Sequence, residues 1–289
     1  MRDFVILVNP ISGDGRAAQR VRPVAEALRG AGGQVAEILT KGSDHARQEA
    51  RRAAESGAVV VAAGGDGLVR DVASGVAPAG GVMGIVPAGR GNDFARRIGI
   101  PQDTEGQIHL LRDGEPRPID VMECAGSTVP GNLYVGIDSV ANQMINSSRW
   151  LPGLLVYRMA PVITVLRWRP ATFTVGVDGT DHTVRGHTIV VANSGAYGHG
   201  LLIVPSAVVD DGELDVMTIG EIPRWKIGTV MREATEGRHV HRPEITVHRG
   251  REVTISADRA LPVFADGDYL TELPVTVRLH PGRLRVLRP

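Results

Sequence analysis

The stretch AVVVAAGGDGLVRDVASGV, residues 58–76, decides the fold. Its first half is an apolar run that ends in glycines, which predicts a buried strand, and Leu68–Val76 carries apolar residues at helical spacing. The same alternation fills the first third of the chain. Strands that alternate with helices predict βαβ units around a parallel sheet, in which ligands bind at the carboxyl ends of the strands. The other expected strands are Phe4–Val8, Val35–Leu39 and Val82–Val86, and the other expected helices are Arg16–Leu28 and Asp44–Glu55.

The pattern changes after about residue 119. Strand-like stretches follow one another between Pro, Gly and Asp turns, which predicts a largely antiparallel sandwich or barrel. Two helical stretches interrupt them, near Ser147–Leu166 and Pro223–Thr235. We therefore expect an α/β domain over residues 1–119 and a β-rich domain over residues 120–279. The expected strands are Arg117–Glu123, Leu133–Ile137, Thr172–Val177, Thr183–Val191, Glu213–Ile219, Ile245–His248, Glu252–Ser256, Leu261–Phe264, Val275–Leu279 and Leu284–Leu287.

The composition excludes several classes of protein. The 289 residues include 32 Lys and Arg, 32 Asp and Glu, and one cysteine, Cys124, which excludes an internal disulfide and a multi-cysteine zinc site. A net charge of zero argues against bulk attraction to nucleic acid. No apolar run approaches the roughly 18 residues that a membrane-spanning helix needs. We expect a soluble protein of a reducing compartment, the cytoplasm.

Three loops rich in small residues follow expected strands of the first domain. They are Asn9–Gly15, Gly64–Gly67 and Pro87–Arg96. Glycines let the backbone approach a ligand, and grouped N–H groups at a helix start favour a phosphate. Asp66 and Asp93 lie in these loops, where a carboxylate suits a phosphate site if Mg²⁺ stands between them. Ordinary turns with capping side chains also explain each loop taken alone.

A fourth loop, Phe264–Asp268, lies in the second domain and taken alone predicts a hairpin turn. The first three loops all follow parallel strands, whose carboxyl ends meet at one edge of a sheet. Together they predict a nucleoside triphosphate held by backbone amides, with carboxylates that order magnesium.

The order of these motifs resembles the diacylglycerol kinase catalytic-domain family, which includes soluble bacterial lipid kinases and the sphingosine and ceramide kinases. The resemblance rests on Asn-Pro-x-Ser-Gly, Gly-Gly-Asp-Gly and Pro-x-Gly-x-Gly-Asn-Asp-Phe-Ala-Arg, and it continues along essentially the whole chain. It implies a nucleotide domain, a β-rich domain and an active site in the cleft between them, with residues 280–289 returning to the first domain. The later matches are Ile119-Asp120, Gly136-Ile137-Asp138, Asn193-Ser194, residues 210–215 and Ala265–Asp268.

The resemblance also implies a role for each matching residue. Asp268 would accept the proton of the acceptor hydroxyl, with Asp266 beside it in the same motif. Three carboxylates would order catalytic Mg²⁺ through water: Asp66, Asp93 and Asp120. Asp211, with backbone oxygens of Val208 and Glu213, would hold a structural metal ion, unless this turn is a plain hairpin. The nucleotide would contact Asn9, Pro10, Ser12, Gly13, Thr40, Gly64, Gly65, Asp66, Gly67, Asp71, Gly89, Arg90 and Asn92.

Three positions depart from the family pattern. Leu68 replaces the threonine after Gly-Gly-Asp-Gly, Arg90 replaces the threonine of Gly-Thr-Gly-Asn-Asp, and Asp268 replaces the glutamate of Asp-Gly-Glu. Each change removes or moves one polar contact, while the metal-ordering carboxylates are retained. We expect an active kinase, with a non-catalytic member of the family as the alternative.

Acceptor choice is expected in the second domain, where residues 147–169 mix apolar and aromatic side chains with arginines. The segment suits a helix at a bilayer interface, with Trp150 and Arg149 in contact with lipid, or a helix packed on the sheet with its arginines at the rim. Tyr197 and His199 are candidates for the acceptor pocket. The expected partners are ATP, Mg²⁺ and a lipid substrate at a membrane surface, with no nucleic acid, and a homodimer is left open.

The expected activity is ATP- and Mg²⁺-dependent phosphorylation of a lipid hydroxyl, with diacylglycerol converted to phosphatidic acid. The alternatives are a kinase of a non-lipid alcohol, an NAD-kinase-like enzyme, which shares Gly-Gly-Asp-Gly, and a non-catalytic lipid- or nucleotide-binding protein.

Overall fold

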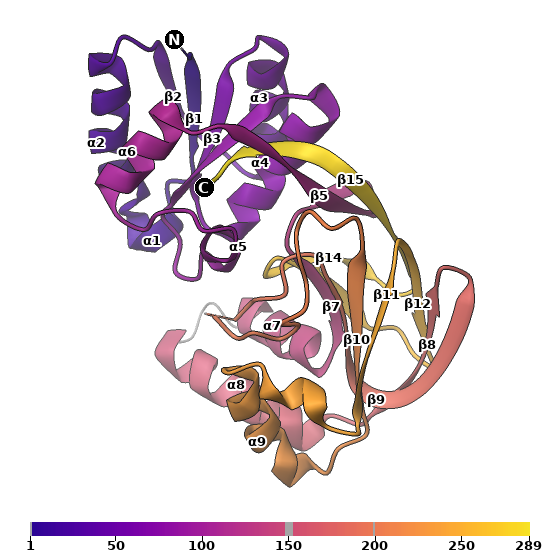
Figure 1. Ribbon diagram of the computed structural model, residues 1–289. Coiled ribbons are helices and arrows are strands. Elements are labelled where there is room, and N and C mark those ends of the chain that lie inside the picture. The colour runs from indigo at the N-terminus through magenta and orange to yellow at the C-terminus, as the bar shows by residue number, and fades with distance from the viewer. Residues whose placement is uncertain (1, 148–152, 199) are drawn as a thin grey trace.

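The computed structural model describes residues 2–147, 153–198 and 200–289 (Figure 1). The N-terminal half is an α/β domain with helices on both faces of a parallel sheet. The sheet has the order β2-β1-β3-β4, with β1 (Phe4–Val8), β2 (Val35–Leu39), β3 (Val59–Gly64) and β4 (Val82–Pro87). The helices are α1 (Ser12–Gly15), α2 (Ala17–Gly30), α3 (Ser43–Glu55), α4 (Asp66–Ala79), α5 (Asp93–Arg97) and α6 (Thr104–Asp113).

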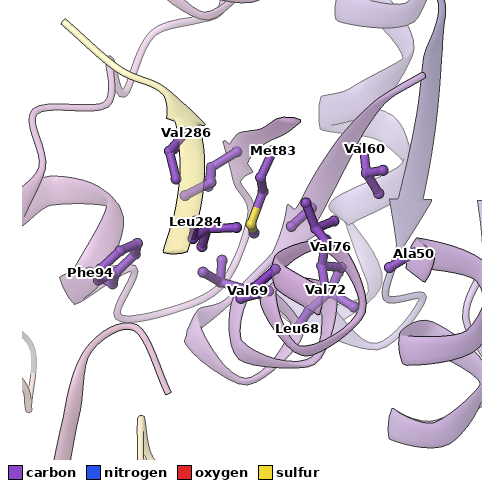
Figure 2. Packing of buried hydrophobic residues seen from close by; sticks show 14 of the residues in the cluster. Ala50, Val60, Leu68, Val69, Val72, Val76, Met83, Phe94, Leu284 and Val286 are labelled. Carbon is purple, nitrogen blue, oxygen red and sulfur yellow. The ribbon is translucent and has the colours of Figure 1, made fainter. Parts of the chain in front are cut away.

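Alternate residues of β1 belong to two different cores. Ile6 packs with Val24 of α2, whereas Leu7 packs with Val72 of α4. Successive side chains of a strand point to opposite faces, and a parallel sheet covered on both faces needs apolar residues at every position. Figure 2 shows the α4 side of this core, where Val69 and Val72 lie near Met83 of β4. The continuous apolar strands of the sequence follow from this double burial.

Strand β15 (Val275–Leu287) links the two domains. Its first residues pair antiparallel with β12 (Glu252–Ala257), and Arg285 and Val286 pair parallel with β4. β5 (Pro116–Cys124) runs antiparallel along β15, with an irregular register between His280 and Leu284. Leu284 and Val286 are buried in the N-terminal core (Figure 2). The sequence predicted two strands because Pro281 and Gly282 read as a turn, but the register irregularity accommodates them within one strand.

The second domain is β-rich and mostly antiparallel. Its central strand, β9 (Thr180–Ala192), pairs with β7 (Asn132–Gly136), β8 (Ala171–Val177) and β10 (Leu214–Gly220). The other strands are β6 (Ser127–Val129), β11 (Ile245–Gly250), β13 (Pro262–Ala265) and β14 (Asp268–Glu272). The predicted fold class, an α/β domain followed by a β-rich antiparallel domain, is confirmed.

Helices lie at one end of this second domain. They are α7 (Ile137–Ser147), α8 (Gly153–Arg167), α9 (Arg224–Ala234) and the 3₁₀ helix η1 (Arg238–His241). The sequence did not predict α7, because the apolar run before it reads as a strand that continues to Ile137. That strand ends at Gly136, whose φ of +136° turns the chain into the helix, and a Cβ there would lie 2.2 Å from the His187 carbonyl.

No helix within the described ranges is both long and apolar enough to span a membrane. Figure 1 shows α8 and α9 at the end of the second domain that is remote from strands β1–β4. Trp150 and Arg149, the predicted lipid contacts, and His199 lie outside the described residues.

Candidate active site

Three loops lie together at the carboxyl edge of the parallel sheet, because β1, β3 and β4 are neighbours. The Asn9 N–H donates to the Ala63 carbonyl (3.2 Å), and the Ala88 N–H donates to the Gly64 carbonyl (2.9 Å). Pro10 then leads into the one-turn helix α1, which starts at Ser12. The structure therefore brings the three glycine-bearing stretches of the sequence side by side.

Glycines allow these loops to pack backbone against backbone. A Cβ on Gly13, whose φ is +59°, would lie 2.5 Å from the Ala88 oxygen. A Cβ on Gly89 would lie 2.4 Å from the Cα of Gly65. No side chain fits at such distances, so the close approach requires glycine. Grouped backbone N–H groups of this kind favour an anion.

Several of the predicted nucleotide contacts already have partners within the protein, among them Thr40, Asn92 and Asp71. Thr40 is buried beside the end of β1, and its hydroxyl donates to the Val8 carbonyl (3.3 Å). Asn92, in a left-handed conformation with φ 55°, closes its own loop through both backbone groups of Gly89. Asp71 is buried on α4, with its Oδ1 3.4 Å from a guanidinium nitrogen of Arg47. Thr40 and Asn92 thus shape the loops, and Asp71 links α3 to α4.

Asp66 and Asp93 form a close carboxylate pair at the starts of α4 and α5. The Asp66 carboxylate accepts the N–H groups of Asp93 (3.2 Å) and Phe94 (3.1 Å), which fixes the first turn of α5 against α4. A Cβ on Gly91 would lie 3.3 Å from Oδ2 of each aspartate, so both oxygens border the same space. Burial raises the pKa of the Asp66 carboxyl, and the nearby Asp93 carboxylate raises it further. A cation between these groups would relieve both effects.

Asp268 of the second domain reaches across to the Gly64–Gly67 loop. A Cβ on Gly67 would lie only 2.3 Å from its Oδ2, so the carboxylate occupies the space that this glycine leaves open. Arg70, buried on α4, donates to the Ala265 carbonyl (2.8 Å) and lies 3.5 Å from Asp268 Oδ2. This arginine was missed at the sequence level, although it lies on the same helix as Asp66, one turn further along.

Asp266 shapes the turn before β14. It has a left-handed φ of 49°, and its carboxylate accepts the N–H groups of Asn132 (2.7 Å) and Gly131 (3.3 Å). Burial raises the pKa of Asp266 to about 7. The side chain thereby ties the β13–β14 turn to the start of β7.

Asp120 stands apart from the carboxylate pair in its bonding. Its two oxygens accept the N–H groups of Gly212 and Gly282, each at 2.7 Å, and its own N–H donates to the Val209 carbonyl. The side chain amide of Asn193 donates to its backbone oxygen (2.8 Å). These bonds give Asp120 a positional role where β5 and β15 run side by side between the domains, and its magnesium-ordering role stays a prediction.

The predicted structural metal site contains an arginine. Asp211 is paired with a guanidinium nitrogen of Arg249, and a second nitrogen lies 2.8 Å from the Glu213 carboxylate. The Asp211 carboxylate of the predicted site therefore already has an arginine partner, and the structural metal ion stays a prediction.

One cavity of about 510 Å³ joins the carboxylates to an apolar compartment. One end is bordered by Asp66, Arg90, Asp93 and Asp266. The other end is bordered by apolar side chains of three helices: Ile137, Ala141 and Ile145 of α7, Val165 of α8, and Ile227 and Met231 of α9. The cavity thus places charged side chains beside the three glycine-bearing loops and is lined elsewhere by apolar side chains.

Four polar side chains also border the cavity: Tyr134, Asp138, Asn142 and Tyr197. Tyr197 donates its hydroxyl to the Asp138 carboxylate (2.7 Å), and its ring stacks on Tyr134 with centroids 4.8 Å apart. Asn142 donates to the Tyr134 hydroxyl (2.6 Å). Burial raises the pKa of Asp138 to about 6. The sequence predicts Tyr197 for the acceptor pocket, but it does not predict Tyr134 or Asn142.

Two family models match the chain. The model described as the diacylglycerol kinase catalytic domain covers residues 3–124. The model described as the YegS C-terminal NAD kinase beta sandwich-like domain covers residues 131–288. Residues 125–130, which include β6, lie between the two matches.

Similar proteins extend over nearly the whole chain. A Mycobacterium tuberculosis protein named diacylglycerol kinase is 32% identical over 98% of this chain and 94% of its own length. A Staphylococcus aureus protein of the same name is 24% identical, over 93% and 87%. A crystal structure of a diacylglycerol kinase from Bacillus anthracis shares the fold, with a TM-score of 0.75 at 18% identity over 100% of this chain and 97% of that one. Another structure from that organism gives 0.82 at 20% identity, over 100% and 95%.

Proposed function

This chain belongs to the diacylglycerol kinase family, a family of kinases, and we propose that it transfers the γ-phosphoryl group of ATP to a lipid hydroxyl, with diacylglycerol as the acceptor. The cavity is the observation that carries this proposal, because it joins Asp66 and Asp93 to an apolar compartment between α7, α8 and α9. An acyl chain matches that apolar lining, and a hydroxyl at its head would reach the charged end.

The strand-end loops would hold the nucleotide phosphates. Backbone N–H groups around Gly13 and Gly65 suit the phosphate oxygens, and the loops approach one another closely enough to border a single ligand. Arg90 borders the cavity at this end and would add a positive charge next to the transferred group. Positioning and charge neutralisation carry most of the catalysis in phosphoryl transfer.

Asp66 and Asp93 fit a magnesium ion in their chemistry. Carboxylate oxygens are hard ligands, and two acidic groups that border one space are stabilised by a cation. Within the described residues no group of three or more acidic, histidine or cysteine side chains is placed to hold a metal ion. Water and phosphate oxygens would therefore complete the ligands, as Mg²⁺ commonly requires. When bound, the ion neutralises charge on the phosphates.

Asp268 would accept the proton of the acceptor hydroxyl. It lies over the Gly64–Gly67 loop, where the terminal phosphate would sit, and Arg70 orients its carboxylate. General-base help of this kind is worth roughly 10²–10⁴-fold in rate. Asp266 keeps the Asp268 turn in place through the N–H groups of Gly131 and Asn132.

Exposed apolar side chains at the helical end of the second domain support contact with a membrane. Leu166 is 66% exposed on α8, and Trp225 is 78% exposed at the start of α9, beside Lys226. Both helices also border the cavity, so lipid entering from a bilayer would meet these side chains on its way. Aromatic and basic residues together suit a bilayer interface. Among the side chains of these helices that the structure describes, Met159, Val162 and Met231 are also exposed and apolar.

A transfer assay tests the proposed reaction. Purified protein is incubated with γ-labelled ATP and Mg²⁺ and with diacylglycerol, ceramide, sphingosine or NAD in separate reactions. We expect label in phosphatidic acid. Label in NAD would favour the NAD-kinase-like alternative, and ATP binding without transfer to any acceptor would favour a non-catalytic protein. Label in ceramide or sphingosine alone would retain a lipid kinase but replace its acceptor.

A further inference from the structure

Arg249 lies at the centre of three carboxylates of the second domain, of which only Asp215 is buried. Its three guanidinium nitrogens each face a different acid: Nη2 is paired with Asp211, Nη1 lies 2.8 Å from Glu213 Oε2, and Nε lies 3.9 Å from Asp215 Oδ2. Strands β10 and β11 create this arrangement, because their antiparallel register sets Asp215 directly opposite Arg249. The three acids are alternate residues of one stretch, so their side chains reach the same arginine from one side.

We propose that Arg249 is the permanent cation of this turn and replaces the divalent ion that the family resemblance implies for Asp211. A guanidinium keeps its charge at every physiological pH, and its planar fork can meet several carboxylates at once. A metal ion at the same oxygens would be repelled by the arginine charge. This inference does not depend on the proposed function, since it concerns a site outside the cavity.

Two further arginines bind oxygen atoms of the same turn. Arg251 donates its Nε–H to the Gly212 carbonyl (3.0 Å), and Arg288 is paired with the Asp210 carboxylate. A divalent ion prefers carboxylate and backbone carbonyl oxygens as ligands. Here such oxygens of residues 210–213 are already hydrogen-bonded to or paired with arginine side chains. These side chains therefore occupy the oxygens that an ion would use.

The arginine stabilises a turn on which the domain junction depends. The Gly212 N–H donates to the Asp120 carboxylate (2.7 Å), whose other oxygen accepts the N–H of Gly282. Asp211 itself accepts the Glu213 N–H (3.1 Å), which keeps the turn closed. A change at Arg249 would therefore reach the paired strands β5 and β15 through Gly212 and Asp120.

The test is metal-dependent stability of the nucleotide-free, full-length protein. Thermal unfolding is followed in EDTA and in Mg²⁺ or Ca²⁺ at equal ionic strength. We expect the divalent ions to change the melting temperature of the wild type no more than that of Asp211→Asn, because the Asp66–Asp93 pair is present in both proteins. Arg249→Met leaves three carboxylates without their central cation, so its melting temperature should fall by several degrees in EDTA and recover with the divalent ions. Arg278→Met is the matched control, because Arg278 pairs with one exposed acid, Glu252, on a neighbouring strand.

Direct ion binding provides a second measurement that does not need the variant to be stable. Bound Mn²⁺ is counted by electron paramagnetic resonance in the wild type and in Asp211→Asn. Equal Mn²⁺ content in the two proteins is the expected result. The proposal is overturned if the wild type is stabilised by divalent ions and Asp211→Asn removes that stabilisation, if Asp211→Asn lowers the Mn²⁺ content, or if Arg249→Met is no less stable than the wild type in EDTA.

Discussion

The Asp268 carboxylate lies against Gly67 across the boundary between the domains, with Oδ2 only 2.3 Å from the position of a Gly67 Cβ. The absence of a side chain at Gly67 is thus the condition for Asp268 to approach the Gly64–Gly67 loop. Because β14 starts at Asp268 and α4 starts at Asp66, two elements distant in the chain meet at this point. Arg70 connects the same two elements through the Ala265 carbonyl.

Replacing Gly67 with alanine should therefore disable the reaction without unfolding the protein. The added methyl displaces Asp268, and we expect kcat to fall by about 10²–10⁴-fold, the range of general-base catalysis. Gly30→Ala at the end of α2 is the control, since within the described chain a Cβ there meets open space. Steady-state rates with saturating ATP check this, and a Gly67→Ala enzyme with wild-type kcat would contradict it.

Asp268 itself should control the rate and not the binding of nucleotide. Asp268→Asn removes the proton acceptor while preserving size, so kcat should fall by roughly 10²–10⁴-fold with an unchanged Kd for ATP. Asp268→Glu introduces the glutamate of the family pattern, which keeps a carboxylate at this position, and should retain activity. Equal kcat for Asp268→Asn and the wild type would remove Asp268 from the mechanism.

Asp266 should make the protein less stable as pH rises. Its pKa is about 7 in the folded protein against 3.8 as the ordinary value, so the folded state binds more protons than the unfolded state between these pH values. The stability from this group is complete below about pH 4 and is lost as pH rises through 7. Urea unfolding at pH 5 and pH 8 measures this, with Asp266→Asn as reference. The wild type should lose stability relative to the variant, and a parallel change in both proteins would argue against the assignment.

The exposed side chains of α8 and α9 should affect binding to bilayers but not the reaction with a water-soluble substrate. Leu166→Glu combined with Trp225→Glu places charge on this surface, so we expect at least tenfold weaker sedimentation with anionic vesicles. Activity on a short-chain, water-soluble diacylglycerol should stay near the wild-type level, because neither residue borders the cavity. Val247→Glu, a change at an exposed apolar residue of β11, is the control. Unchanged vesicle binding by the double variant would refute membrane contact through α8 and α9.

The fold was largely predictable because its signals are local. The apolar run before Gly64 and the helical spacing after Leu68 reproduce β3 and α4, and the glycine loops follow strands that happen to be neighbours. α7 could not be predicted in the same way, since only the turn at Gly136 separates it from β7.

The long-range contacts of the site were much less accessible from sequence. Arg249 meets Asp211 only because β10 and β11 pair in one register, and no local pattern encodes that register. Asp120 matched a catalytic motif, yet its oxygens accept N–H groups from Gly212 and Gly282, which are distant in the chain. A motif can identify which residue types are present, whereas the pairing of strands decides which groups they meet.

Filling the apolar compartment tests the central claim most directly. Ala141→Trp places an indole in the cavity from α7, while Gln143→Trp places the same side chain at an exposed position of that helix. Transfer of label from ATP to diacylglycerol is measured for both, together with the Kd for ATP. We predict that Ala141→Trp loses transfer by more than tenfold and keeps its Kd, and that Gln143→Trp keeps both. Undiminished transfer by Ala141→Trp would show that the acceptor binds elsewhere and would contradict the account.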